Sequence, residues 1–297
     1  MIHKSKCNEI LVFGSSGMLG HVVYNYLSSK NKFKVIPTSN QFKAFNNTIL
    51  LDIRDLNNVE EYLNEIRPDF VINCAGLLIS ESKNRLEDAI MINSLFPNVL
   101  SRLGNVLNFK LIHISTDCVF SGCKGKYNEY DYRDGSGSYA LTKILGEVIS
   151  DTNLTIRTSI IGPELNVNGD GLFHWFMNQS GSISGYTKAI WSGVTTLELA
   201  KAVEWSIDNN ITGLYHVTNN SSINKHELLK LFQKHTKKDI SIKSVDGKNV
   251  DKSFIDTRLL MNYKIPSYDQ MIYDMVNLIS NNRVLYSQYK VGVFDKE

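Results

Sequence analysis

The 297-residue sequence lacks an apolar run long enough to cross a membrane, so no membrane partner is predicted. It also lacks an excess of charge of one sign, with a formal net charge of +2 at pH 7 and no basic stripe. This balance gives no electrostatic case for binding nucleic acid. Residues 1–6 are basic, but they lead into a strand-like run rather than a signal-peptide core, and no signal peptide is expected.

Cysteines are few. The four are Cys7, Cys74, Cys118 and Cys123. The last two lack a second pair at zinc-ligand spacing. His174, His216 and His226 likewise show no ligand spacing with cysteines or carboxylates, so no metal site is expected. Cys74 and Cys118 lie in apolar, strand-like runs, which favours buried free thiols and a reducing, cytoplasmic setting.

What is present is an ordinary globular composition, with 42% hydrophobic and 21% charged residues. Short apolar runs alternate with helical patterns through the first half of the chain. The strand-like runs cover residues 10–13, 33–36, 48–51, 70–76, 111–114 and 154–157, and the helical patterns cover residues 21–29, 56–66, 84–105 and 139–150. This alternation predicts a Rossmann-type α/β fold with a doubly wound parallel sheet.

The regularity breaks after residue 161, and the remainder predicts a smaller C-terminal α+β lobe. Thr195 and Glu198 have the spacing of a capping box, which predicts a helix start. Asp55 and Asn224 are predicted to cap two other helices.

A glycine-rich turn follows the first strand-like run and precedes a helical pattern. It reads Gly14-Ser15-Ser16-Gly17-Met18-Leu19-Gly20, a G-x-x-G-x-x-G spacing. Glycines allow a tight turn and a close approach of backbone to a ligand, and a helix N-terminus favours a pyrophosphate. The strand–turn–helix context favours a dinucleotide site, and a glycine turn without a ligand is the alternative.

The second strand-like run ends at Thr38-Ser39-Asn40, without the Asp or Glu that would bind the ribose 2′-hydroxyl of NAD. Lys43 lies close in the sequence. The missing acid removes a repulsion against a 2′-phosphate, which favours NADP(H) over NAD(H). We therefore expect residues 1–160 to form an NAD(P)-binding domain, interleaved with a substrate-binding lobe at residues 161–297.

Tyr139 and Lys143 lie four residues apart in a predicted helix and would share one of its faces. An ammonium beside a phenol favours the phenolate, so the pair could give a proton to a carbonyl oxygen or take one from an alcohol. The alternative is an ordinary solvated helix face.

Four features stand in order: the glycine turn, Asn73-Cys74-Ala75-Gly76, Ser115-Thr116-Asp117, and Tyr139 with Lys143. This set resembles the extended short-chain dehydrogenase/reductases. The runs STDCVFSG, GKYNE, SYALTKILGE and IRTSIIG look like the dTDP-4-dehydrorhamnose reductase group within that superfamily.

The resemblance implies roles for particular residues. Tyr139 would be the proton donor, Lys143 would assist it and hold the nicotinamide ribose, and Thr116 would hydrogen-bond the reacting oxygen. Asn93 would support the active-site helix, with a plain helix surface as the alternative. The implied cofactor-binding residues are Gly14, Ser15, Gly17, Met18, Leu19 and Gly20 at the pyrophosphate, Asp52 and Ile53 at the adenine, Ala75 and Gly76 flanking the cofactor, and Tyr139 and Lys143.

The group reduces the 4-keto group of nucleotide-linked 4-keto-6-deoxysugars in bacterial surface polysaccharide synthesis. The implied substrate is dTDP-4-dehydrorhamnose or a UDP-2-acetamido-2,6-dideoxy-4-hexulose. Besides Thr116, candidate substrate-binding residues are Arg157, Lys188 and Trp191. The alternatives are a solvated charge for Lys188 and a core residue of the lobe for Trp191. Two other functions stay open, an epimerase of the same superfamily and a non-catalytic dinucleotide-binding regulatory subunit. A homodimer is expected from general frequency.

Overall fold

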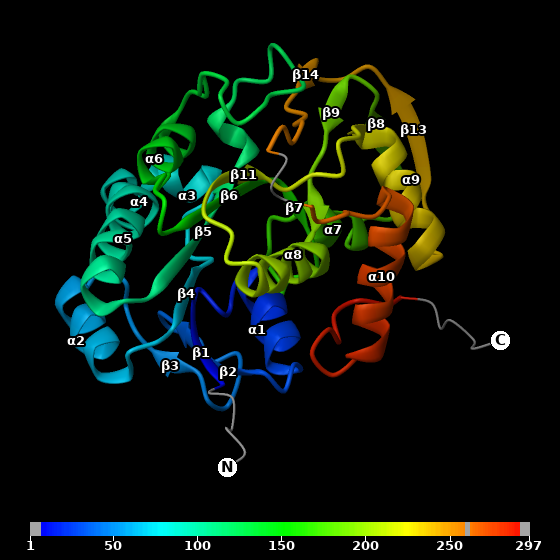
Figure 1. Ribbon diagram of the computed structural model, residues 1–297. Helices are drawn as coiled ribbons and strands as arrows, with labels where there is room; N and C mark the ends of the chain where they lie inside the picture. The colour runs from blue at the N-terminus through cyan, green and yellow to red at the C-terminus, as the bar shows by residue number, and fades with distance from the viewer. Residues whose placement is uncertain (1–6, 259–261, 292–297) are drawn as a thin grey trace. The chain divides into compact units, whose positions relative to one another are not determined.

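The computed structural model describes residues 7–258 and 262–291 of the chain (Figure 1). A seven-stranded sheet has the order β11-β6-β5-β4-β1-β2-β3. Its strands are β1 (Asn8–Phe13), β2 (Phe33–Ser39), β3 (Ile49–Leu50), β4 (Phe70–Asn73), β5 (Lys110–Thr116), β6 (Leu154–Thr158) and β11 (Gly213–His216). β1 pairs with β2 and β4, β2 with β3, and β4 with β5, each in parallel. The predicted Rossmann-type sheet is confirmed.

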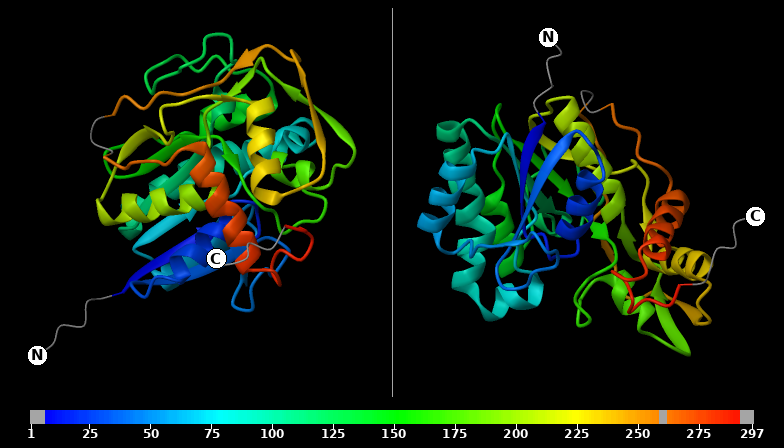
Figure 2. Two further views of the ribbon diagram at one scale, coloured as in Figure 1. Left: turned by 90° about the vertical axis from the view of Figure 1, so that its right-hand side faces the viewer. Right: turned by 90° about the horizontal axis from the view of Figure 1, so that it is seen from below.

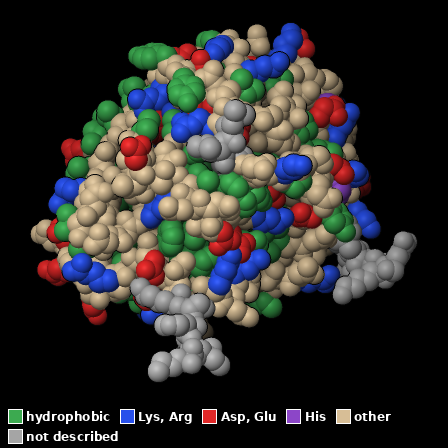
Figure 3. All heavy atoms as spheres, in the orientation of Figure 1, with side chains coloured by type: hydrophobic (Ala, Val, Ile, Leu, Met, Phe, Trp, Pro, Cys, Tyr) green, Lys and Arg blue, Asp and Glu red, His purple; other side chains and the backbone are tan. Residues whose placement is uncertain are grey.

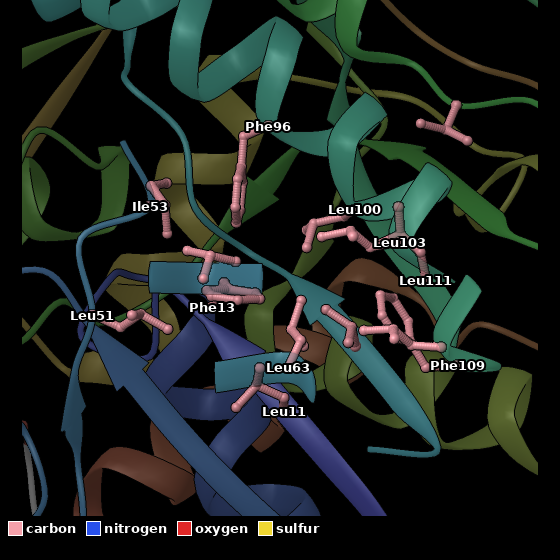
Figure 4. Close-up of a cluster of buried hydrophobic side chains, with 14 of the residues drawn as sticks. Leu11, Phe13, Leu51, Ile53, Leu63, Phe96, Leu100, Leu103, Phe109 and Leu111 are labelled. Carbon is pink, nitrogen blue, oxygen red and sulfur yellow. The ribbon is translucent and has the colours of Figure 1, made fainter. Parts of the chain in front are cut away.

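Both faces of the sheet are covered. Leu11 and Phe13 of β1 pack into a buried apolar cluster with α2 (Leu56–Ile66) and α5 (Phe96–Leu107), as Figure 4 shows. Ile10 and Val12 alternate with them and are also completely buried. Figure 2 shows α1 (Gly20–Ser28) on the face opposite α2 and α5. A parallel strand buried on two faces explains why its sequence is continuously apolar.

The helical pattern predicted at residues 84–105 is not one helix, and that prediction is wrong. α3 (Ile79–Asn84) and α4 (Leu86–Ala89) are separated at Arg85, whose φ of −134° and ψ of 65° are not helical. A π-helical segment at Ile90–Leu95 then leads into α5. α6 (Ser138–Gly146) also stops before its predicted end, because the next residue has an extended backbone.

Three predicted helix caps are confirmed. Asp55 accepts a hydrogen bond from the backbone N–H of Asn58 at 3.1 Å. Thr195 and Asn224 accept from the third residue beyond them at 3.2 and 2.8 Å. The carboxylate of Glu198, the other residue of the predicted capping box, accepts a hydrogen bond from the Tyr263 hydroxyl at 2.6 Å. This is a contact between residues distant in sequence.

The chain divides into two compact, interleaved units. Unit 1 comprises Met1–Ser115, Ser136–Ile156 and Val203–Leu214, and unit 2 comprises Thr116–Gly135, Arg157–Ala202 and Tyr215–Glu297. Residues 1–6, on which the signal-peptide expectation rests, lie outside the described residues. Each unit is described by itself below.

Unit 2 combines short strands with helices. Its remaining elements are β7 (Ile160–Ile161), α7 (Leu172–Met177), β8 (Ser182–Tyr186), β9 (Ala189–Trp191), β10 (Val194–Thr195), β12 (Ile223–Asn224), α9 (Lys225–Thr236), β13 (Ser241–Val245), β14 (Val250–Asp251) and α10 (Tyr268–Asn281), with α8 (Thr196–Asp208) shared with unit 1. β9 lies between β12 and β14, and β8 pairs with β13. Mixed strands and helices agree with the predicted α+β lobe.

Within the described ranges, none of the helices has both the length and the apolar character needed to cross a bilayer. In the view of Figure 3, Lys and Arg side chains are interspersed with Asp and Glu side chains. This mixture matches the balanced charge of the sequence.

Candidate functional site

In unit 1, the glycine turn connects the end of β1 to the start of α1. Gly14 has a φ of +75°, a conformation that favours glycine, and a Cβ atom there would lie 2.9 Å from the backbone nitrogen of Ala75. A Cβ atom at Gly20 would lie 2.1 Å from the carbonyl oxygen of Gly14. The turn therefore packs against its own backbone and against the end of β4, and larger residues would open it.

The predicted pyrophosphate residues divide between surface and core. Gly17 is exposed and Met18 is partly buried, whereas Leu19 is buried. Ser15 is buried and its hydroxyl donates to the carbonyl oxygen of Thr38 at 2.9 Å. Among the described residues no side chain caps the N-terminus of α1. An uncapped helix start beside an exposed glycine fits an anionic group such as a pyrophosphate.

Two hydroxyls meet where β2 ends. Ser16 of the turn and Ser39 of β2 have their Oγ atoms 3.0 Å apart. Asn40 and Lys43, which follow β2, are exposed. This edge presents hydroxyl, amide and ammonium groups, and the acid that would bind a ribose 2′-hydroxyl is absent from the sequence here.

Asp52 and Ile53, predicted to lie at the adenine, follow β3. The Arg54 guanidinium donates to the Asp52 carboxylate at 2.6 Å and holds the pKa of that carboxyl below its usual range. Ile53 is 9% exposed and belongs to the core cluster. The ion pair of Asp52 and the core packing of Ile53 therefore both fix the position of the backbone at these two residues.

The helix α6 inverts the usual amphipathic pattern. Lys143 is only 5% exposed, and its Nζ donates to the carbonyl oxygen of Ile114 on β5 at 2.8 Å. Leu141 and Leu145 on the same helix are 53% and 67% exposed. Tyr139, one turn before Lys143, is partly buried. The alternative of an ordinary solvated helix face is excluded for Lys143, because a solvated face would expose the ammonium.

The groups around Lys143 shift the pKa of its ammonium in opposite directions. Burial lowers the pKa of Lys143 to about 8, and the carboxylate of Glu147 and the thiol of Cys74 oppose that shift. Glu147 is 9% exposed and accepts a hydrogen bond from the Ser115 hydroxyl at 2.6 Å. Sequence reasoning missed Glu147, although its position four residues after Lys143 was a usable signal.

Asn93 lies in the π-helical segment and is completely buried, so the alternative of a plain helix surface is wrong. Its side-chain oxygen accepts from the N–H of Leu77 at 2.9 Å, and its amide nitrogen donates to Thr142 of α6 at 3.2 Å. A Cβ atom at Gly146 would lie 1.8 Å from the Asn93 carbonyl oxygen. Asn93 therefore joins α6 closely to the loop after β4, which carries Gly76.

In unit 2, Thr116 is at the carboxyl end of β5. Its hydroxyl donates to Asp117 at 3.1 Å and accepts from the N–H of Cys118 at 3.1 Å. The side chain is 8% exposed. Both of its hydrogen-bonding functions are oriented by the two residues that follow it.

The other predicted substrate residues occupy different environments. Arg157 is 1% exposed and hydrogen-bonds His216 at 3.0 Å, an arrangement typical of a structural core residue. Lys188 is exposed and forms an ion pair with Asp246 at 2.6 Å. The structure does not bring Arg157 and Lys188 together through any hydrogen bond or ion pair between described residues.

Trp191 is 4% exposed on β9, and its ring stacks at a tilt against Tyr268, 5.7 Å between centroids. The Nζ of Lys225, the first residue of α9, lies 5.2 Å from the centroid of the Trp191 ring. Sequence reasoning missed Lys225, and no local pattern could have found it, because its neighbours come from distant segments.

Comparisons with known proteins show the family to which this chain is similar. The family model described as the RmlD substrate binding domain matches residues 8–253. The chain is 28% identical to the "Probable low-salt glycan biosynthesis reductase Agl14" of Haloferax volcanii, over 71% of this chain and 75% of that protein. It is 26% identical to the spore coat polysaccharide biosynthesis protein SpsK of Bacillus subtilis, over 80% of this chain and 82% of that protein.

A solved structure described as a hypothetical dTDP-4-dehydrorhamnose reductase from Sulfolobus tokodaii matches with a TM-score of 0.76 and 27% identity. The match covers 88% of this chain and 98% of that one. Because the family match runs from β1 into the last strand of unit 2, it confirms the resemblance based on the four sequence motifs. The chain belongs to the RmlD family of the extended short-chain dehydrogenase/reductases.

Proposed function

We propose that this protein is an NADPH-dependent reductase of the 4-keto group of a nucleotide-linked 4-keto-6-deoxysugar. The observation that carries the proposal is the buried Lys143 ammonium, fixed on the Ile114 carbonyl one turn after Tyr139. Burying an ammonium costs free energy, which only hydrogen bonds or nearby opposite charges can offset. In a family of oxidoreductases, this arrangement supports a tyrosine that gives a proton to a ketone oxygen.

Tyr139, Lys143 and Thr116 have separate roles in the proposed reaction. Tyr139 donates its proton to the substrate oxygen, and the Lys143 ammonium stabilises the phenolate that remains. Thr116 donates a hydrogen bond to the same oxygen once its hydroxyl turns from Asp117. A reduced nicotinamide, when bound, would supply the hydride for the carbonyl carbon, and with the proton from Tyr139 the ketone would become the alcohol.

The proposed cofactor is NADPH rather than NADH. The glycine turn would hold the pyrophosphate, because Gly17 is exposed and the start of α1 carries no side-chain cap among the described residues. Ser16, Ser39 and Lys43 are the residues that would hold the 2′-phosphate. Hydroxyls and an ammonium favour a phosphate there, whereas a carboxylate would repel it.

The proposed substrates are dTDP-4-dehydrorhamnose or a UDP-2-acetamido-2,6-dideoxy-4-hexulose, used in building a bacterial surface polysaccharide. The names of the two relatives, a glycan biosynthesis reductase and a spore coat polysaccharide protein, support this class. We assign the dinucleotide to unit 1 and the sugar to unit 2. The exposed Leu141 and Leu145 of α6 offer an apolar surface for a second copy of the chain.

The test is a direct assay of reduction. The protein is mixed with NADPH or NADH and with each candidate 4-keto-6-deoxysugar, and absorbance of the reduced nicotinamide is followed. We expect consumption of NADPH with one sugar and slower consumption of NADH. No consumption, with NAD retained through desalting, would support an epimerase. No consumption with exchangeable NADPH binding would support a regulatory subunit.

Glu147→Gln is expected to move the alkaline limb of the pH–rate profile to lower pH. Burial already lowers the pKa of Lys143 to about 8, and the Glu147 carboxylate raises it. Without that carboxylate the pKa falls further, so Lys143 loses its proton at lower pH, by about one unit. The check is kcat between about pH 6 and pH 10.

The matched control for this prediction is Glu60→Gln. Glu60 is a residue of unit 1 whose side chain is 46% exposed and pairs with Arg102 at 3.8 Å. This control should keep the wild-type profile. An unchanged alkaline limb in a folded Glu147→Gln protein would show that Glu147 does not set the charge of Lys143.

A further inference from the structure

One cation of unit 2 has no part in the function described so far. Lys225 begins α9 directly after β12, and β12 pairs antiparallel with β9. This pairing sets Asn224 opposite Ile190 and brings the Lys225 ammonium to 5.2 Å from the Trp191 ring centroid. The backbone therefore fixes where Lys225 lies, since Asn224 also caps the helix at 2.8 Å.

Lys225 is partly buried where its ammonium lies beside the Trp191 ring. Burial lowers its pKa to about 8, and the nearby Asp117 carboxylate opposes that shift. Within residues 7–258 and 262–291, the ammonium makes no hydrogen bond or ion pair, and its direct contact is the Trp191 ring. A partly buried ammonium with unused N–H donors is a binding group for an acceptor brought by a ligand.

Asp117 connects this cation to the proposed chemistry. It follows Thr116 and accepts a hydrogen bond from that hydroxyl at 3.1 Å. Thr116, Asp117 and Lys225 therefore belong to one polar group of unit 2, with the Trp191 ring beside it. The group draws on the end of β5, on β9 and on the start of α9.

We infer that Lys225 contacts the substrate and sets its specificity, by donating a hydrogen bond to the hydroxyl on C3 of the pyranose. The inference rests on the proposed function, in which Thr116 binds the oxygen on C4. Of the two ring carbons next to C4, C5 carries the apolar C6 methyl group and C3 carries a hydroxyl. The acceptor adjacent to the reacting carbonyl is therefore the C3 hydroxyl.

The charge of Asp117 near Lys225 limits the kind of group that fits. A hydroxyl accepts from the ammonium and donates to the carboxylate at the same time, so it satisfies both. A carboxylate on the sugar would face Asp117 with like charge. The diphosphate is attached at C1, across the ring from C4, and so belongs elsewhere in the bound substrate.

The test is a cycle between a protein change and a substrate change. The variants are Lys225→Met and, as matched control, Lys230→Met, an exposed lysine of α9 that pairs with Glu227 at 3.4 Å. The substrates are the 4-keto-6-deoxysugar nucleotide reduced by the wild type and its 3-deoxy counterpart. Each kcat/KM is measured, together with the Kd for NADPH.

We expect the wild type and Lys230→Met to prefer the 3-hydroxy sugar by about 10- to 100-fold, the range for a hydrogen bond to a charged group. Lys225→Met should lose about the same factor on the 3-hydroxy sugar and discriminate by less than about 3-fold. Its Kd for NADPH should match the wild type. A merely structural role would lower kcat/KM for both sugars equally and leave the preference for the 3-hydroxy sugar unchanged.

Full discrimination by Lys225→Met overturns the inference, and so does a wild type that ignores the 3-hydroxyl. If Lys225→Met folds poorly by thermal unfolding, Lys225→Gln replaces it in the same cycle. Calorimetric binding of the same sugars, without NADPH, separates this inference from the proposed function. Binding that depends on Lys225 and the 3-hydroxyl, without turnover, upholds the inference and overturns the reductase. Turnover that does not depend on Lys225 upholds the reductase and overturns the inference. If no sugar binds, the inference and the proposed reductase are both overturned.

Discussion

Tyr139→Phe is expected to lower kcat for ketone reduction by about 100- to 10,000-fold, the range for losing a general acid. The change removes one hydroxyl from a partly buried ring at the start of α6. Lys143 remains buried and bonded to the Ile114 carbonyl, so the local structure should persist. NADPH affinity should therefore stay close to the wild-type value. The measurement is single-turnover oxidation of bound NADPH, with a parallel fluorescence titration of NADPH.

Tyr132→Phe is the matched control for that experiment, because Tyr132 is 86% exposed and loses the same hydroxyl. It should behave as the wild type does. Full activity in Tyr139→Phe would remove Tyr139 as the proton donor. A loss of both NADPH binding and folding would mean that the hydroxyl is structural.

Gly20→Ala is expected to weaken NADPH binding by at least about 100-fold and to destabilise the fold by about 1–3 kcal/mol, the usual cost of overpacking. A Cβ atom at Gly20 would lie 2.1 Å from the Gly14 carbonyl oxygen and 2.9 Å from the Cα atom of Ser15. These are backbone atoms, so no side chain can turn aside to relieve the clash. The turn must move, and the start of α1 moves with it.

Ser28→Ala at the exposed far end of α1 is the matched control for Gly20→Ala, and it should bind NADPH normally. Both proteins are compared with the wild type by thermal unfolding and by NADPH titration. Wild-type binding and stability in Gly20→Ala would show that the turn does not need a glycine at this position.

Elements with local sequence signals could be predicted without the structure. The continuous apolar residues Ile10 to Phe13 predict a strand buried on both faces, and β1 is such a strand. Asp55 and Asn224 predict helix starts, because a cap bonds an N–H only three residues away. The RmlD-type motifs also lie in single short runs, and their residues and order predicted the family that the comparisons show.

The sequence misled where a local pattern was overridden by distant contacts. The apolar periodicity of residues 84–105 resembles one helix, yet the chain leaves helical geometry at Arg85 and becomes π-helical at Ile90–Leu95. Asn93 in that segment bonds Leu77 and Thr142, which are distant in sequence. A change of helix register lets the segment turn this amide into the core, and no window of neighbouring residues contains that reason.

The partners of the polar groups in the candidate site follow only from the tertiary structure. Glu147 meets Ser115 across 32 residues, and Arg157 meets His216 across 59, which makes Arg157 a core residue despite its charge. Lys225 reaches Trp191 and Asp117 because a strand pairing brings α9 to β9. Hydrogen bonds and charges act over a few ångströms in space, so their partners follow from how strands pair and helices pack. Periodicity, caps and glycine turns act along the chain, and these are what the sequence alone determined.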